Sequence, residues 1–129
     1  MSEWAKLKPV VWIGSSKIDF LEFPDEVKAI VGYALYVAQR GGKHVDAKPL
    51  HGFGGAGILE VIADHRGDTF RTIYTVRLAG RVYVLHAFQK KSKSGIKTPK
   101  GQIELLKARL KRAEQEHADS LRSSRFSGS

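Results

Sequence analysis

The sequence predicts a single α+β domain in which a small antiparallel sheet carries helices on one face, in the order β-α-α-β-β-β-α. Three observations support this fold class. Residues 58–90 hold three stretches rich in Val, Ile, Tyr, Phe and Thr, separated by short turns, as in a three-stranded meander. Residues 24–40 and the segment after Thr98-Pro99 carry apolar residues at helical spacing. The length of 129 residues suits one such core.

The N-terminal segment is predicted to supply one strand and one short helix. Residues 1–8 are predicted to be a flexible arm. Residues 9–13 (PVVWI) are typical of a short strand, which would join the sheet beside the meander. Ser15 and Ser16 are candidate N-caps for a helix of one or two turns that ends near Phe23.

The clearest helix is predicted at residues 24–40. Pro24 suits a first helical position, and Asp25 and Glu26 meet the positive end of the helix dipole. The glycine-rich segment 43–57 is predicted to be a flexible connector, because it lacks the Gly-Lys-Ser/Thr ending of a nucleotide-binding loop and precedes a strand pattern.

The centre of the fold is predicted to be a hairpin over Thr69–Lys91, with its turn at Leu78-Ala79-Gly80, where glycine can adopt a positive φ. Side chains alternate along a strand, so one face of the first arm should carry Arg71, Ile73 and Thr75, and the other Phe70, Thr72, Tyr74 and Val76. A cationic cluster at the end of a rigid sheet can hold a phosphate, and Arg71 is expected to be exposed there.

The C-terminal third is predicted to begin with a basic loop, residues 90–97, followed by a last helix with Thr98 as N-cap and Pro99 as its first residue. The folded domain should span residues 9–117. Residues 118–129 have little to bury and are predicted to be a disordered tail.

The charge distribution favours a polyanionic partner. The formal net charge is +9, and residues 89–129 hold eleven Lys or Arg against four acidic residues. A soluble basic domain without a nucleic-acid role is equally compatible with charge alone. The chain has no cysteine, no signal-peptide pattern and no run of membrane-spanning length, so we expect a cytoplasmic protein without a membrane partner.

In the order and spacing of several short motifs, the sequence resembles the RelE/ParE superfamily of bacterial toxins, within it the HigB-like, phage-derived host-killing branch. The matching residues run through most of 9–117: Lys48-Pro49-Leu50, Gly52, Leu59-Glu60, Phe70-Arg71-Thr72-Ile73-Tyr74, residues 84–91 (VLHAFQKK), Thr98-Pro99, and Ala108 with Arg109.

The resemblance implies the toxin half of a type II toxin–antitoxin system, neutralised by a cognate antitoxin, that cleaves messenger RNA on the ribosome as a metal-independent endoribonuclease with no cofactor. Two alternatives stay open. The superfamily also contains ParE-like inhibitors of DNA gyrase that are not enzymes, and the chain could be a degenerate basic RNA-binding module.

The resemblance also implies candidate site residues. Arg71 matches the arginine that contacts the scissile phosphate, and Lys91 or its neighbour Lys90 matches the basic residue after the last strand. HigB members use histidines, which makes His51 and His86 candidates for proton transfer. Further lysines are candidate RNA contacts: Lys48, Lys93, Lys97 and Lys100.

Several of these residues also have ordinary structural explanations. Arg71 could pair with Glu60 or Asp68 across the sheet. By simple alternation His86 would share a face with Val82, Val84 and Phe88, as a hydrogen-bonded core histidine. Relatives of the RelE type carry lysines where this chain has Glu60 and Ile62. The five histidines are scattered without a carboxylate cluster, so no metal site is predicted.

Overall fold

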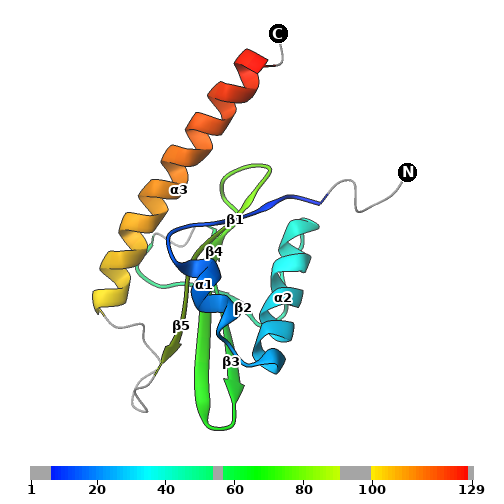
Figure 1. Cartoon of the computed structure of the whole chain (residues 1–129), viewed down its shortest axis with the longest axis vertical. Coiled ribbons are helices and arrows are strands. Elements are labelled where there is room, and N and C mark those ends of the chain that lie inside the picture. The colour runs from blue at the N-terminus through cyan, green and yellow to red at the C-terminus, as the bar shows by residue number, and fades with distance from the viewer. Residues whose placement is uncertain (1–6, 54–56, 91–99, 128–129) are drawn as a thin grey trace.

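The computed structural model describes residues 7–53, 57–90 and 100–127. Figure 1 shows a sheet flanked by helices, and the α+β class predicted from the sequence is confirmed. No helix in this part of the chain is both long and apolar enough to cross a membrane. The elements are β1 (Val10–Trp12), α1 (Ser16–Leu21), α2 (Asp25–Gln39), β2 (Ala47–Pro49), β3 (Ile58–His65), β4 (Asp68–Thr75), β5 (Val82–Lys90) and α3 (Lys100–Ser127).

The sheet has five strands in the order β1-β5-β4-β3-β2. Strands β3, β4 and β5 form the predicted antiparallel meander, and β1 joins it in parallel beside β5. Strand β2 lies within the segment predicted to be a connector, and that part of the prediction is wrong. Its three residues pair with β3 at the sheet edge, where Pro49 is tolerated because no further strand needs its missing N–H.

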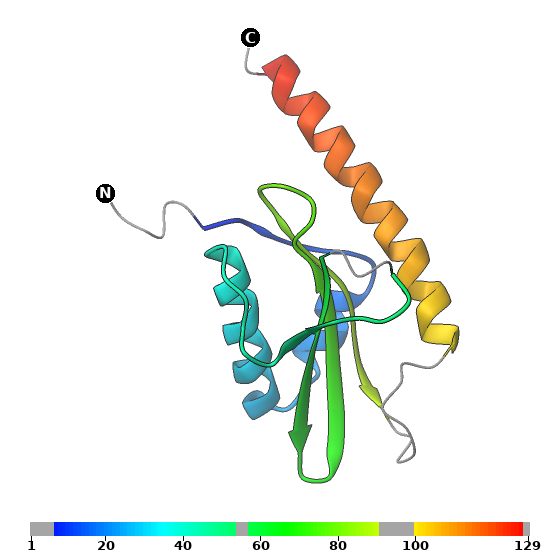
Figure 2. The same cartoon turned by 180° about the vertical axis from the view of Figure 1, so that it is seen from behind.

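The two faces of the sheet carry separate hydrophobic cores. On one face, α2 packs its buried side chains, such as Val27, Val31 and Ala34, against the sheet. On the other face, α3 packs Leu106, Leu110 and Ala113 against the sheet. The prediction that all helices cover one face is therefore wrong in this detail. Figures 1 and 2 show α2 and α3 on opposite sides of the sheet.

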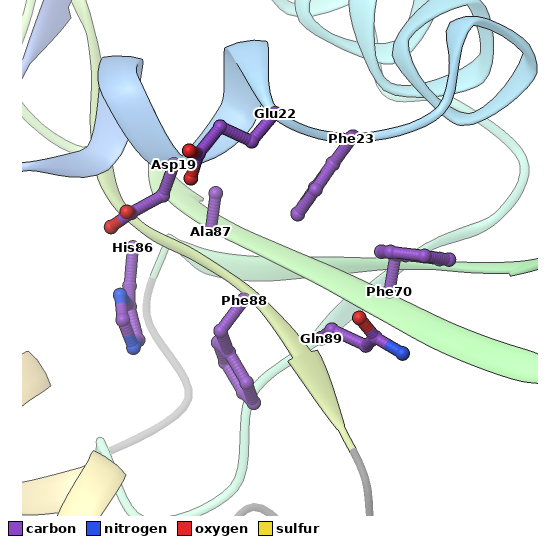
Figure 3. A pocket seen from close by; sticks show the side chains of 8 residues that line it. All are labelled: Asp19, Glu22, Phe23, Phe70, His86, Ala87, Phe88 and Gln89. Atoms are coloured by element: carbon purple, nitrogen blue, oxygen red, sulfur yellow. The ribbon is translucent and has the colours of Figure 1, made fainter.

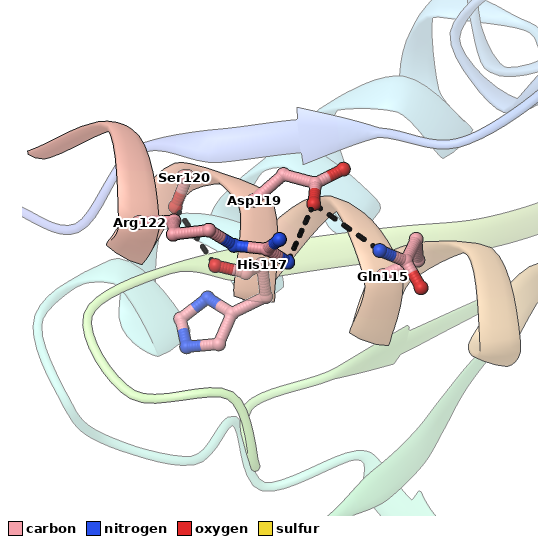
Figure 4. Close-up of polar contacts among 5 residues, drawn as sticks. All are labelled: Gln115, His117, Asp119, Ser120 and Arg122. Carbon is pink, nitrogen blue, oxygen red and sulfur yellow. Dashed lines mark hydrogen bonds and ion pairs between the residues drawn. The ribbon is translucent and has the colours of Figure 1, made fainter.

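Helix α3 is longer than the sheet that it covers. His117 of α3 still contacts the sheet, since its Nδ1 lies 3.3 Å from the Tyr83 hydroxyl. Beyond this point the helix is stabilised by its own side chains, since Asp119 accepts hydrogen bonds from Gln115 and Arg122, one turn away on either side (Figure 4). The helix runs to Ser127, past the residue at which a disordered tail was predicted to begin.

Candidate functional site

Three neighbouring rows of side chains build a polar cluster on the α3 face of the sheet. Residues opposite each other on paired strands lie on the same face, so the strand registers define these rows. The first row runs Lys48, Glu60, Ile73, His86; the second runs Ile62, Arg71, Phe88; the third runs Asp64, Thr69, Lys90. Four polar residues of these rows are buried: Glu60, Arg71, His86 and Lys90.

A β-bulge in β5 places His86 in this cluster. The register between β4 and β5 shifts after Ile73, which pairs with His86, while Tyr74 pairs with Val84. Leu85 is the extra residue, so Leu85 and His86 both face α3. The prediction from simple alternation, that His86 shares a face with Val82 and Val84, is therefore wrong. Its third member, Phe88, does share the face of His86, and the two rings are stacked.

Arg71 and Glu60 form a buried ion pair at the centre of the cluster. Arg71 Nη1 donates to Glu60 Oε2 at 2.7 Å, and the two residues are 3% and 8% exposed. The expected exposure of Arg71 is wrong, and the alternative of cross-sheet pairing with Glu60 is what the structure shows. The carboxylate fixes the guanidinium in one orientation, so Arg71 acts on its surroundings mainly as a fixed positive charge.

Lys90 ends β5 beside this pair. Burial and then the positive charge of Arg71 lower the pKa of the Lys90 ammonium, and the Glu60 carboxylate opposes the shift. A lysine whose pKa is lowered is a better proton donor than an ordinary surface lysine. Lys90 is therefore a candidate proton donor on this face.

His86 is held between two residues of α3. Its Nε2 donates to Gln102 Oε1, and its Nδ1 accepts from Arg109 Nη1 at 3.1 Å. Because an amide oxygen only accepts and a guanidinium only donates, these partners select the neutral Nε2–H tautomer. Burial is the main cause that lowers the pKa of His86; Gln102 raises it, Arg109 lowers it and Asp19 raises it. Both ring nitrogens are hydrogen-bonded, so this arrangement fixes the orientation of the His86 ring.

Arg109 connects three elements. Its guanidinium also donates to the Leu85 carbonyl at 3.0 Å and to Ser15 Oγ at 3.1 Å, and Ser15 donates to Asp19 at 2.7 Å. Gly14, with φ +59°, makes room for it, since an added Cβ would lie 2.9 Å from Arg109 Nε. The lowered pKa of Arg109 is due first to burial.

Gln102 and Arg109 were not predicted as site residues, yet the sequence held a signal for them. They stand four residues before and three residues after Leu106, and so fall on the apolar stripe of α3. Polar residues at positions of a buried stripe need polar partners, which here are the ring nitrogens of His86.

A pocket of about 330 Å³ lies on the outer edge of β5, beside the cluster. Figure 3 shows Asp19 and Glu22 on one wall, with His86 and Phe88 from β5 opposite. Among the described residues that line it are two carboxylates and no lysine or arginine. A phosphate group would be repelled by these two carboxylates.

The other predicted site residues are distributed differently. Lys48 is exposed on the cluster face, in the row of Glu60. His51 is exposed in the turn after β2 and makes no hydrogen bond or ion pair within the described part of the chain. Lys100 begins α3. The remaining candidates, Lys91, Lys93 and Lys97, lie outside the described residues.

The fold and the cluster together define a small basic α+β protein with lysine and arginine grouped on one sheet face. Residues 18–111 match the family described as "Phage derived protein Gp49-like (DUF891)". This is well over half of the chain, so the chain belongs to that family, and the resemblance to a phage-derived branch is confirmed.

Comparison with solved structures finds a distant likeness. A chain of the toxin–antitoxin complex RelBE2 from Mycobacterium tuberculosis is 18% identical, with a TM-score of 0.43, and the match covers 67% of this chain and 94% of that chain. A search of curated proteins gave no significant match.

Proposed function

We propose that this chain is the cytoplasmic toxin of a type II toxin–antitoxin pair, and that it cleaves messenger RNA on the ribosome. Membership of the phage-derived family supports the class of protein. The observation that carries the proposal is the position of Lys90 beside the buried Arg71–Glu60 pair, because a cation with a lowered pKa on a basic face suits the chemistry of a phosphodiester.

Cleavage of RNA without a metal ion requires three things. A base takes the proton of the 2′-hydroxyl, whose oxygen attacks the adjacent phosphorus; cations stabilise the phosphorane; and an acid protonates the departing 5′-oxygen.

Lys90 supplies the acid and a positive charge. Arg71 is a positioning residue, which holds Glu60 and lowers the pKa of Lys90. Glu60 and His51 are the candidate bases, and exposed Lys48 extends the basic surface along the RNA.

A cognate antitoxin would neutralise this activity. An acidic or apolar segment laid over the Lys90 face would exclude the RNA backbone and satisfy the same cations. The net charge of +9 favours such a partner as well as RNA.

The test is a ribosome-programmed cleavage assay with mapping of new 5′ ends. Lys90→Met should reduce the cleavage rate at least about 100-fold, the usual contribution of a positioned acid or base, with little change in stability. Lys90→Arg should fail to restore the rate, because a guanidinium keeps the charge but does not give up its proton. Lys28→Met, which removes a lysine of α2 on the opposite side of the sheet, is the matched control and should cleave normally.

Other outcomes would identify other functions. Restored cleavage in Lys90→Arg would show that only the charge matters. Growth arrest without new 5′ ends would contradict the nuclease and favour an inhibitor of DNA gyrase. RNA binding without growth arrest would favour a non-catalytic module.

A further inference from the structure

The outer side of α2 carries a stripe of exposed apolar side chains. Ile30, Tyr33 and Tyr36 are 39%, 59% and 40% exposed, although the helix already buries five other residues against the sheet. Figure 2 shows α2 on the flank of the molecule, with the sheet between it and α3. The stripe is therefore independent of the Lys90 face, and a partner bound there would leave that face open.

The aromatic side chains of the stripe hold one another in place. Tyr33 lies 6.5 Å from Tyr36 between ring centroids, and the ring of His44 meets Tyr33 edge-on at 5.5 Å. The Arg40 guanidinium lies over Tyr36, 5.8 Å from its centroid. Tyrosine and arginine, with tryptophan, are enriched at the energetic centres of protein interfaces, and ordered side chains lose less entropy on binding.

The charges at the two ends of the stripe are of opposite sign. Asp25 and Glu26 stand at the N-terminal end of α2, and Arg40 and Lys43 at or just after its C-terminal end. An identical helix laid antiparallel across it, with the two Tyr33 side chains at the twofold axis, meets opposite charge at both ends. In that register Glu26 faces Arg40 of the second copy, and Ile30 faces Tyr36 of the second copy. Between these two pairs, the smaller side chain of Ala29 faces Val37 of the second copy.

We propose that this stripe is a self-association surface, on which a second copy of the chain packs its own α2 antiparallel. The fit is isologous, as a twofold dimer requires, because each residue of the stripe has its complement on the same helix. Antiparallel helices also bring opposite dipole ends together. Net charge does not oppose the contact, since residues 25–43 hold three basic and two acidic side chains while the excess lies in residues 89–129.

The small size of the surface favours a weak dimer. Helix α2 has 15 residues, so the contact is about 22 Å long at ~1.5 Å per residue. One helix pair buries less than the roughly 800 Å² per partner of a standard interface. The dimer is therefore expected to dissociate in the micromolar range rather than to be permanent.

Analytical ultracentrifugation of the full chain, from low micromolar to several hundred micromolar, tests the proposal. The wild type should shift from monomer to dimer across this range. Glu26→Arg and Arg40→Glu should each raise the dimer dissociation constant at least about tenfold, because like charges then face each other across the contact. The double variant restores the opposite-charge pairs in reverse and should dimerise within about threefold of the wild type.

One control separates charge pairing from a local structural effect. Glu26 Oε2 also lies 2.8 Å from His65 Nδ1, so replacement of Glu26 disturbs a contact to the β3–β4 hairpin. His65→Ala removes that contact without changing the charge of the stripe and should leave the dissociation constant unchanged. Circular dichroism would show that every variant is folded.

Three results would overturn the proposal. The wild type could stay monomeric at all concentrations, which would leave the stripe to a different protein. Folded single variants could dimerise as well as the wild type, or the folded double variant could fail to regain dimerisation. None of these results bears on RNA cleavage, so the two proposals fail independently.

Discussion

The two faces of the central sheet use the same strands for different purposes. Phe70 and Arg71 are neighbours on β4 and both are buried, yet Phe70 packs edge-on against Phe23 on the α2 face and Arg71 is ion-paired on the α3 face. The α2 side is an almost wholly apolar layer of helix against sheet. On the α3 side, part of the sheet face is apolar, and the rest carries the buried polar residues Glu60, Arg71, His86 and Lys90.

This contrast shows that the fold buries charged side chains on the α3 face of the sheet. A buried ion pair is weak support for stability, because desolvation offsets most of the attraction between the charges. Apolar residues of similar size would pack at least as well in the same place. Stability alone is therefore a weak reason for the polar cluster, and the proposed function gives Lys90 and Arg71 a role in binding an anion.

The largest expected effect comes from breaking the pair from one side. Arg71→Met should lower the free energy of unfolding by about 3–5 kcal/mol, because it leaves the Glu60 carboxylate buried without its partner. Urea unfolding followed by circular dichroism measures this loss.

The double variant Arg71→Met with Glu60→Leu separates folding from function. It replaces the pair by apolar groups of similar size and should regain stability to within about 1 kcal/mol of the wild type. It should still lack RNA cleavage, because the charge that lowers the pKa of Lys90 is gone. Full cleavage by this variant would show that the pair is structural only.

An intermediate effect is expected from pH on the α3 face. Burial lowers the pKa of His86, so below its ordinary pKa near 6.5 the unfolded chain takes up a proton that the folded chain does not. Stability should therefore fall as the pH drops below about 6.5, by at most ~1.4 kcal/mol per pH unit for this one group, until the lowered pKa is reached.

His86→Gln isolates this contribution from that of the other histidines. Glutamine can keep contacts to Gln102 and Arg109 but does not titrate, so the variant should show a shallower decline in thermal midpoint between pH 7 and pH 5. Identical slopes in the two proteins would mean that His86 is protonated as easily in the folded state as in the unfolded chain.

The sequence predicted the elements better than it predicted their surroundings. Alternation along β4 correctly separated Phe70 and Tyr74 from Ile73, because β4 pairs regularly with β3. The same rule failed at His86, since a bulge depends on how two strands meet and leaves no mark in the residue pattern.

The candidate site was predictable in composition and not in geometry. The choice of Arg71, Lys90 and His86 followed from the family resemblance, and the structure brings all three to one face. Their burial depends on the fold as a whole, including a helix that the sequence did not place on that face. The polar positions Gln102 and Arg109 on the apolar stripe of α3 were the available hint that this helix covers a polar cluster.

The smallest expected change in the free energy of unfolding comes from a substitution on the α2 face, and the sign of that change is informative. The Tyr74 hydroxyl is buried with no hydrogen-bond partner in the described part of the chain, and burial raises the pKa of Tyr74 to about 12. Removing an unsatisfied buried hydroxyl removes its desolvation cost, so Tyr74→Phe should leave the free energy of unfolding unchanged or raise it by about 1 kcal/mol.

Urea unfolding of Tyr74→Phe beside Tyr83→Phe completes the comparison of the faces. Tyr83 is also fully buried but lies on the α3 face, with its hydroxyl 3.3 Å from His117, so its replacement should lower stability by about 1 kcal/mol. A loss in Tyr74→Phe as large as in Tyr83→Phe would mean that a bound water satisfies the Tyr74 hydroxyl. The α2 layer would then contain a hidden polar contact, and the contrast between a dry face and a polar face would no longer hold.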